Sequence, residues 1–156
     1  PPGEEVDMAR TVSDIIIDAP AAAVMSVIAD FENYPMWATG MQVIEISAET
    51  NDGRPTQVRF NLDSPPIRDT FALRYLWQGD DHVSWCLVPE SETMLTAMDG
   101  SYTLDAVAGG RTRVTYHLSV DLKLPILGML KRKAEKVIVD SALRGLKKRV
   151  ENQTGA

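Results

Sequence analysis

Two aspartates are the side chains in this sequence best suited to acid–base chemistry. Asp69 falls on the same face of a strand candidate as Phe71, and Asp99 stands beside Gly100 in the middle of another. A carboxyl group inside an apolar pocket has a raised pKa and can act as a general acid or base. The alternative is a solvent-exposed carboxylate at a strand end or a bulge. Asp69 and Asp99 are therefore candidates, and the catalytic residues stay unassigned.

Arginine and tyrosine side chains could hold the polar group of a ligand instead. Arg59 and Arg74 could bind an acidic or phenolate group through charge-assisted hydrogen bonds, although their alternation places both on the solvated face of a sheet. The hydroxyls of Tyr75, Tyr102 and Tyr116 could orient a ligand carbonyl. The same tyrosines are equally well explained as core aromatics.

The few histidine and cysteine residues predict neither a metal site nor a nucleophile. His82 and Cys86 could share a strand face, but positions four apart in a strand lie on the order of 13 Å from each other. His117 falls on an outward face, and one cysteine offers no chelating spacing. Phosphate-binding glycine loops and the G-x-S-x-G elbow are absent from the sequence. We therefore expect no metal and no cofactor.

The elements that must position these side chains are mostly strands. Apolar residues alternate along residues 10–18, 41–49, 56–63, 67–78, 82–90, 93–107 and 112–122. One apolar and one wetted face indicate an antiparallel sheet that is covered on a single side. After the first strand, Val24, Val27, Ile28 and Phe31 follow helical spacing, and a second short helix follows. Pro35 then predicts a turn that brings Tyr34, Met36 and Trp37 together as a plug or as one end of a pocket.

A long helix opening at Pro125 and ending near residue 150 is the last predicted element. Its expected inner stripe is Leu127, Leu130, Ala134, Val137, Ile138 and Ser141, continued by Gly145 or Leu146. Small residues on this face leave room for something to lie close to the helix. Residues 131–149 hold eight basic and two acidic residues, and the basic ones are expected on the outer face. That face is either a solvated surface, a contact for anionic lipid through Lys131, Lys133, Lys147 and Lys148, or an RNA contact.

Length and composition predict one soluble domain. The chain has 156 residues and a net charge of −6, so a general attraction to nucleic acid is not expected. Its single cysteine excludes an internal disulfide and fits the cytoplasm, and no apolar run is long enough for a membrane span. We expect residues 1–8 to be an expression remnant or a disordered lead-in, 9–151 to be a single domain, and 152–156 to be a disordered tail.

Several motifs resemble one superfamily. They are I-D-A-P at 17–20, V-M-x-V-I-A-D at 24–30, Y-P-x-W at 34–37, DGSYTL at 99–104 and the final LPILGMLKRKAEKVIVDSALRGLKKRVE. Their order resembles the START-like, SRPBCC helix-grip superfamily (birch-pollen-allergen-like), and within it the actinobacterial polyketide cyclase/dehydrase-type proteins, also linked to coenzyme-Q-binding START-like proteins. The resemblance implies an α+β helix-grip fold. A curved antiparallel sheet of six to seven strands would grip the long C-terminal helix, with two short helices after the first strand and a hydrophobic cavity inside.

The resemblance implies a function by class. Members carry sterols, phospholipids, quinones and polyketides, and a minority catalyse aldol cyclisation or dehydration. Laid on this sequence, the expected cavity walls are Trp37, Phe60, Phe71, Tyr75, Trp85, Tyr102, Tyr116, Ile126, Leu130, Ala134 and Ile138. The first hypothesis is binding or transport of a lipid, quinone or polyketide-like molecule. The alternatives are a cyclase or dehydratase acting on a poly-β-ketone, and a protein- or membrane-interaction module using the basic helix.

Overall fold

The computed structural model describes residues 10–65, 67–123 and 128–154. Its elements in chain order are β1 (Thr11–Ile17), α2 (Ala21–Ala29), the 3₁₀ helix η1 (Phe31–Met36), β2 (Met41–Glu49), β3 (Pro55–Ser64), β4 (Ile67–Gln78), β5 (His82–Leu87), β6 (Leu95–Val107), β7 (Arg111–Leu122) and α3 (Gly128–Thr154). The seven strands form one antiparallel sheet in the order β1-β7-β6-β5-β4-β3-β2. The predicted α+β helix-grip fold is confirmed. The expected tail at 152–156 is wrong in part, because α3 continues to Thr154. Residues 1–8 lie outside the described residues.

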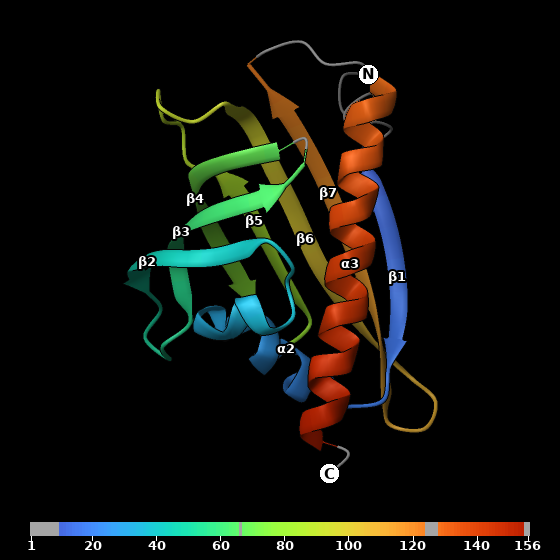
Figure 1. The fold of residues 1–156 in the computed structure, drawn as a ribbon. Coiled ribbons are helices and arrows are strands. Elements are labelled where there is room, and N and C mark those ends of the chain that lie inside the picture. Colours follow the sequence, from blue (N-terminus) through green and yellow to red (C-terminus); the bar gives the residue numbers. More distant parts are fainter. Residues whose placement is uncertain (1–9, 66, 124–127, 155–156) are drawn as a thin grey trace, which may run out of the picture.

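The sheet curves around α3, with α2 and η1 at one end (Figure 1). Alternation explains why one face is buried: Val114, Tyr116, Leu118 and Val120 of β7 are buried, as their spacing predicts. Inward side chains of β3 to β6 join them in one core with the helices. Burial of this apolar surface is the main force that holds the sheet and α3 together.

The first helix packs as its sequence predicts. Val24, Val27, Ile28 and Phe31 are all buried, so the apolar stripe of α2 and the start of η1 faces the core. The plug was predicted correctly for two of its three residues. Tyr34 and Trp37 are buried, whereas Met36 is 68% exposed.

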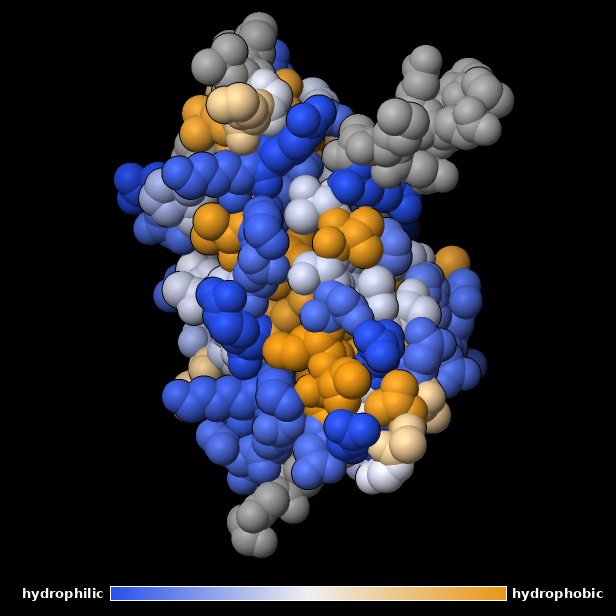
Figure 2. All heavy atoms as spheres, turned by 90° about the vertical axis from the view of Figure 1, so that its right-hand side faces the viewer, coloured by the Kyte–Doolittle hydropathy of each residue, from blue (hydrophilic) through white to orange (hydrophobic). Residues whose placement is uncertain are grey.

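Side chains of α3 satisfy backbone groups in and just after the edge strand β1. Lys147 Nζ donates to the carbonyl oxygen of Ile16 at 2.7 Å, and the backbone N–H of Asp18 donates to Glu151 Oε2 at 2.9 Å. The hydrogen bond from Lys147 and the one from Asp18 lower the pKa of the Glu151 carboxyl. Figure 2 shows the side of the molecule on which β1 lies, where apolar side chains gather along the middle and hydrophilic ones flank them. These two bonds satisfy one carbonyl of the edge strand and one N–H just after it, groups that could otherwise pair with another chain.

The buried face of α3 differs from the predicted stripe. Leu130 and Val137 are exposed, at 43% and 51%, and Leu127 lies outside the described residues. The buried side chains are Ala134, Glu135, Val139, Ala142, Leu143, Leu146 and Val150. Apolar residues occur around most of this helix, so its sequence fits more than one orientation. Only the sheet that it packs against selects one.

Glu135 is fully buried in the core. Thr11 Oγ1 donates to its Oε1 at 2.8 Å, and the backbone N–H of Val120 donates to its Oε2 at 2.7 Å. A buried carboxylate is tolerated when hydrogen bonds of this kind replace its water. Glu135 therefore joins α3 to both β1 and β7.

Candidate ligand-binding cavity

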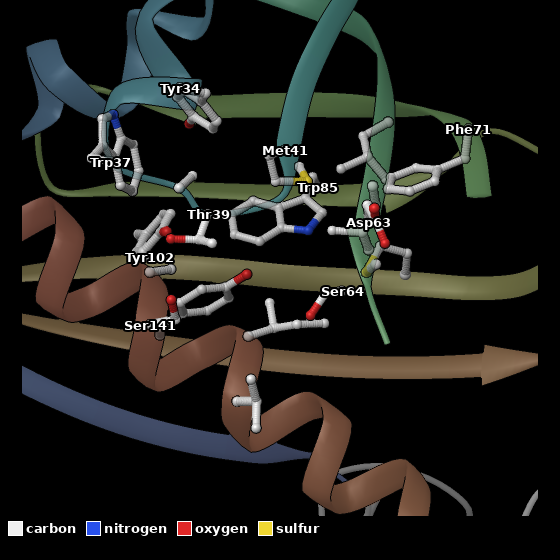
Figure 3. Close-up of a pocket in the computed structure, with 18 of the residues that line it drawn as sticks. Tyr34, Trp37, Thr39, Met41, Asp63, Ser64, Phe71, Trp85, Tyr102 and Ser141 are labelled. Atoms are coloured by element: carbon white, nitrogen blue, oxygen red, sulfur yellow. The ribbon is translucent and has the colours of Figure 1, made fainter. Parts of the chain in front are cut away.

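A cavity of about 210 Å³ lies between the inner face of the sheet and α3. Figure 3 shows Tyr34, Trp37 and Tyr102 towards one end of it, Phe71 and Asp63 towards the other, and Trp85 between them. The lining residues are Tyr34, Trp37, Ala38, Thr39, Met41, Leu62, Asp63, Ser64, Pro65, Phe71, Leu73, Tyr75, Trp85, Met98, Tyr102, Tyr116, Val137, Ile138, Ser141 and Ala142. Most of these are apolar or aromatic, which is the usual lining of a small-molecule site.

Close packing at two glycines shapes the cavity. A Cβ at Gly145 of α3 would collide with the carbonyl oxygen of Trp37, so only glycine lets the helix lie against the residue that follows η1. The indole of Trp85 lies against Gly100 of β6 in the same way. The sequence predicted that small residues on α3 leave room beside the helix. What occupies that room at Gly145 is the backbone of Trp37.

Aromatic rings form a continuous series along the cavity wall. The ring centroids of Tyr102 and Tyr116 are 4.5 Å apart, and those of Trp85 and Tyr116 are 5.7 Å apart. Tyr75 lies 5.6 Å from Trp85, and Tyr34 lies 4.7 Å from Trp37. Such distances are typical of favourable ring contacts. A flat apolar molecule would meet ring faces and edges on several sides.

The four tyrosine hydroxyls differ in their hydrogen bonding. Tyr34 Oη donates to the carbonyl oxygen of Ile28 at 2.5 Å. Tyr75, Tyr102 and Tyr116 line the cavity and are 7%, 5% and 6% exposed, and their hydroxyls have no hydrogen-bond partner in the part of the chain that the structure describes. Burial raises the pKa of all three phenols above the usual value, and neighbouring tyrosines add to this for Tyr75 and Tyr102. The three hydroxyls are therefore neutral at physiological pH.

Charge is nearly absent from the cavity. Asp63 is the single charged side chain among the described lining residues, and it is exposed at the rim, where it pairs with Arg68 at 3.1 Å. Thr39, Pro65 and Val137 are the other exposed lining residues. These four side chains mark the entrance, between the η1–β2 segment, the β3–β4 turn and α3.

The structure brings most of the predicted wall residues together. Trp37, Phe71, Tyr75, Trp85, Tyr102, Tyr116 and Ile138 line the cavity. Phe60 and Ala134 are buried but lie outside the lining; the Phe60 ring packs against Phe31 and Phe71 at centroid distances of 5.9 and 6.2 Å. Leu130 is 43% exposed and is not among the described lining residues. Ile126 lies outside the described residues.

The candidate catalytic residues lie elsewhere. Asp69 Oδ2 accepts hydrogen bonds from Thr93 Oγ1 at 2.5 Å and from the backbone N–H of Met94 at 2.6 Å, beside a polar groove on the outside of the sheet. Asp99 Oδ1 accepts a long bond of 3.4 Å from the N–H of Leu87, with its side chain on the face opposite the buried Met98. Neither aspartate lines the cavity. The donors that bind the Asp69 carboxylate belong to the loop before β6, although strand alternation assigns Asp69 to the inner face of the sheet.

The arginines, histidine and cysteine also face outward. Arg59 forms an ion pair with Glu90 at 2.8 Å, and Arg74 and Cys86 are exposed. His82 Nδ1 lies 2.9 Å from Thr103 Oγ1. Among the described residues, no group of three or more His, Cys, Asp or Glu side chains could hold a metal ion.

The lysines proposed for lipid contact are not equivalent. Lys131 pairs with Asp121 at 2.9 Å, and Lys147 pairs with Glu151 at 2.7 Å. Lys133 and Lys148 are exposed. Within the described ranges, none of the helices has the length and apolar character needed to cross a bilayer. Contact with an anionic lipid surface stays a prediction.

Some lining residues were missed for two different reasons. Leu62, Leu73 and Met98 share the alternation of predicted wall residues, so that pattern could have included them. Thr39 and Ser64 lie at or beyond strand ends, where no periodicity applies. Their contribution depends on how turns distant in sequence meet at the entrance.

Solved structures with the same architecture cover nearly the whole chain. A START superfamily protein from Mycobacterium smegmatis has a TM-score of 0.82 and 23% identity, over 92% of this chain and 98% of that one. A protein from Thermus thermophilus has a TM-score of 0.73 and 20% identity, over 93% and 99%. The Zhui aromatase/cyclase from Streptomyces sp. R1128 has a TM-score of 0.71 and 16% identity, over 93% and 94%. At these identities the similarity shows the START-like helix-grip fold.

Sequence comparison finds no match among curated proteins. The model of one family, described as polyketide cyclase / dehydrase and lipid transport, matches residues 8–151. This range contains all seven strands and nearly all of α3, together with each of the described residues that line the cavity. The fold is thus a hydrophobic ligand-binding fold, and the chain belongs to the polyketide cyclase / dehydrase and lipid transport family.

Proposed function

We propose that this protein binds or transports a small hydrophobic molecule in the cavity between the sheet and α3. The observation that carries the proposal is an aromatic cavity of about 210 Å³ whose single described charge is at the rim. A ligand placed there would exchange water for apolar and aromatic surface. Family membership supports the same general function.

The alternative of a cyclase or dehydratase needs a titratable group that faces the ligand. Asp69, Asp99, Arg59 and Arg74 were the residues considered for that role, and none is among the lining residues. Asp63 lines the cavity, but it is exposed and paired with Arg68. The geometry therefore favours binding over acid–base catalysis by these residues.

Binding is tested directly with the purified protein. A panel of a fatty acid, a quinone and a polycyclic phenol is added while tryptophan fluorescence and native mass are recorded. Trp37 and Trp85 line the cavity, so we expect an occupied cavity to change the emission and to add the mass of one ligand. The proposal is contradicted if no member of the panel binds.

We expect the substitution Ser141→Phe to reduce binding at least tenfold. Ser141 lines the cavity from α3 and is half-buried, so a phenyl group there would occupy part of the space available to the ligand. Isothermal titration calorimetry measures the change. Ser26→Phe, on the exposed side of α2, is the matched control and should bind as the unaltered protein does. Equal affinity in both variants would place the ligand elsewhere.

A further inference from the structure

Three unpartnered hydroxyls point to a class of ligand. We propose that the cavity selects a neutral, planar ring compound whose carbonyl or hydroxyl oxygen is hydrogen-bonded by Tyr75, Tyr102 and Tyr116. This inference rests on the proposed function, because it concerns the same cavity. It goes further by separating oxygenated rings from pure hydrocarbons and from anionic lipids.

The three tyrosines are brought together by strand register. Tyr102 of β6 pairs directly with Tyr116 of β7, and Tyr75 of β4 pairs with Trp85 of β5, which contacts both. Each is more than nine-tenths buried and lines the cavity. The phenols are near enough to affect one another, since Tyr116 and Tyr102 contribute to the raised pKa of Tyr75. All three side chains line the same cavity, so a ligand oxygen inside it can approach their hydroxyls.

Cavity-lining hydroxyls without a protein partner discriminate between ligands. A hydrocarbon that filled the cavity would displace water and leave the hydroxyls of Tyr75, Tyr102 and Tyr116 unsatisfied, which is unfavourable. A ligand with a carbonyl or hydroxyl oxygen would satisfy them. Sites that are built to hydrogen-bond a ligand oxygen reject analogues that lack it more strongly than apolar pockets reject an added methylene group.

Charge separates the proposed ligand from a fatty acid or another carboxylate. No lysine, arginine or histidine is among the described lining residues. A carboxylate inside the cavity would lose its hydration without gaining a cation from the described lining residues. Neutral phenol donors satisfy a ketone or a phenol at much lower cost. The cavity should therefore prefer neutral oxygenated ligands.

Size and shape narrow the class further. A dry cavity of about 150 Å³ accepts benzene. The cavity here is about 210 Å³, which suits about two fused rings. The neighbouring rings of Trp85, Tyr102 and Tyr116 lie 4.5 to 5.7 Å apart and offer flat surfaces to such a molecule.

Four bicyclic probes test the preference by calorimetry: naphthalene, 1-naphthol, 1-tetralone and 1-naphthoate. We expect 1-naphthol and 1-tetralone to bind at least about tenfold more tightly than naphthalene, which corresponds to one or two good hydrogen bonds. The carboxylate of 1-naphthoate should bind more weakly than either. These probes share a similar ring frame, so differences report the oxygen group and its charge.

Variants connect the preference to the three hydroxyls. We expect Tyr75→Phe, Tyr102→Phe and Tyr116→Phe each to weaken the binding of 1-naphthol and 1-tetralone by about two- to tenfold. The affinity for naphthalene should be unchanged or higher. The thermal stability of these variants should not fall, because the lost hydroxyls have no partner among the described residues. Ser101→Ala and Thr115→Val are matched controls, since they remove a hydroxyl from the neighbouring outward positions of β6 and β7.

The outcomes separate this inference from the proposed function. If naphthalene or 1-naphthoate binds as tightly as 1-naphthol, or if the phenylalanine variants lose no selectivity, the ligand class is wrong while cavity binding stands. If the controls change selectivity as much as the tyrosine variants, the assignment to these hydroxyls is wrong. Should none of the probes bind and the wider panel also fail, both the inference and the proposed function are overturned.

Discussion

Replacing Gly145 with alanine is expected to lower the free energy of unfolding by about 2 kcal/mol. The new Cβ would collide with the carbonyl oxygen of Trp37 and would lie 3.0 Å from its carbonyl carbon, so α3 or the η1–β2 segment must move. Alanine is the better helix former by about 1 kcal/mol, so the variant is less stable only if the energetic cost of the collision exceeds that gain. Denaturant unfolding followed by circular dichroism measures the net change.

Gly128→Ala is the matched control for that experiment. Gly128 begins α3, is exposed, and has nothing near the position of an added Cβ. The same substitution there should leave stability unchanged or raise it slightly. If Gly145→Ala were as stable as Gly128→Ala, the close approach of α3 to Trp37 would not constrain the fold. We also expect weaker ligand binding in Gly145→Ala alone, because Trp37 lines the cavity.

The second large effect concerns Glu135. Its replacement by alanine should destabilise the protein by about 3 kcal/mol, because it removes hydrogen bonds to a carboxylate and leaves the buried N–H of Val120 without its acceptor. The substitution improves intrinsic helix propensity slightly, so helix formation alone predicts no loss of stability. Thermal and denaturant unfolding at neutral pH measure the change.

Two further variants define the cause. Glu135→Gln keeps one carbonyl oxygen at the site, so it should lower the free energy of unfolding by only about 1 kcal/mol. Glu92→Ala removes an exposed carboxylate and should change stability by less than about 0.5 kcal/mol. A loss in Glu135→Ala no greater than in Glu92→Ala would show that the link from α3 to β1 and β7 contributes little.

The sheet was predictable because its information is local. Two-residue alternation in β3, β4 and β7 places apolar side chains on one face whatever the rest of the chain does. The stripe of Val24, Val27, Ile28 and Phe31 is equally local, and all four are buried as predicted. Together with the order of elements, these patterns were sufficient for the helix-grip fold.

The orientation of α3 was not predictable in the same way. Leu130 and Val137 are as apolar as Val139 and Leu143, yet the first two are exposed and the last two are buried. Charged residues are rarely fully buried, but Glu135 is buried, and donors from β1 and β7 bind its two oxygens. Those donors are distant in sequence, so a helical pattern alone cannot reveal them.

The candidate catalytic aspartates lie outside the cavity lining for a related reason. Asp69 has the alternation of an inward residue, but the hydroxyl of Thr93 and the N–H of Met94 bind its carboxylate outside the cavity. Hydrogen-bond donors on a loop can thus override the face that strand periodicity assigns near the start of a strand.

The sequence by itself determined the sheet faces, the element order and an inward aromatic set, because periodicity and turn chemistry act between neighbours. The tertiary structure decided which face of α3 is buried, where the entrance lies and which polar groups remain without partners. Hydrogen bonding and close contact join residues far apart in the chain, as Glu135 with Thr11 and Gly145 with Trp37 show. The absence of a described partner for the hydroxyls of Tyr75, Tyr102 and Tyr116 depends on the positions of all their described neighbours, which the sequence does not give.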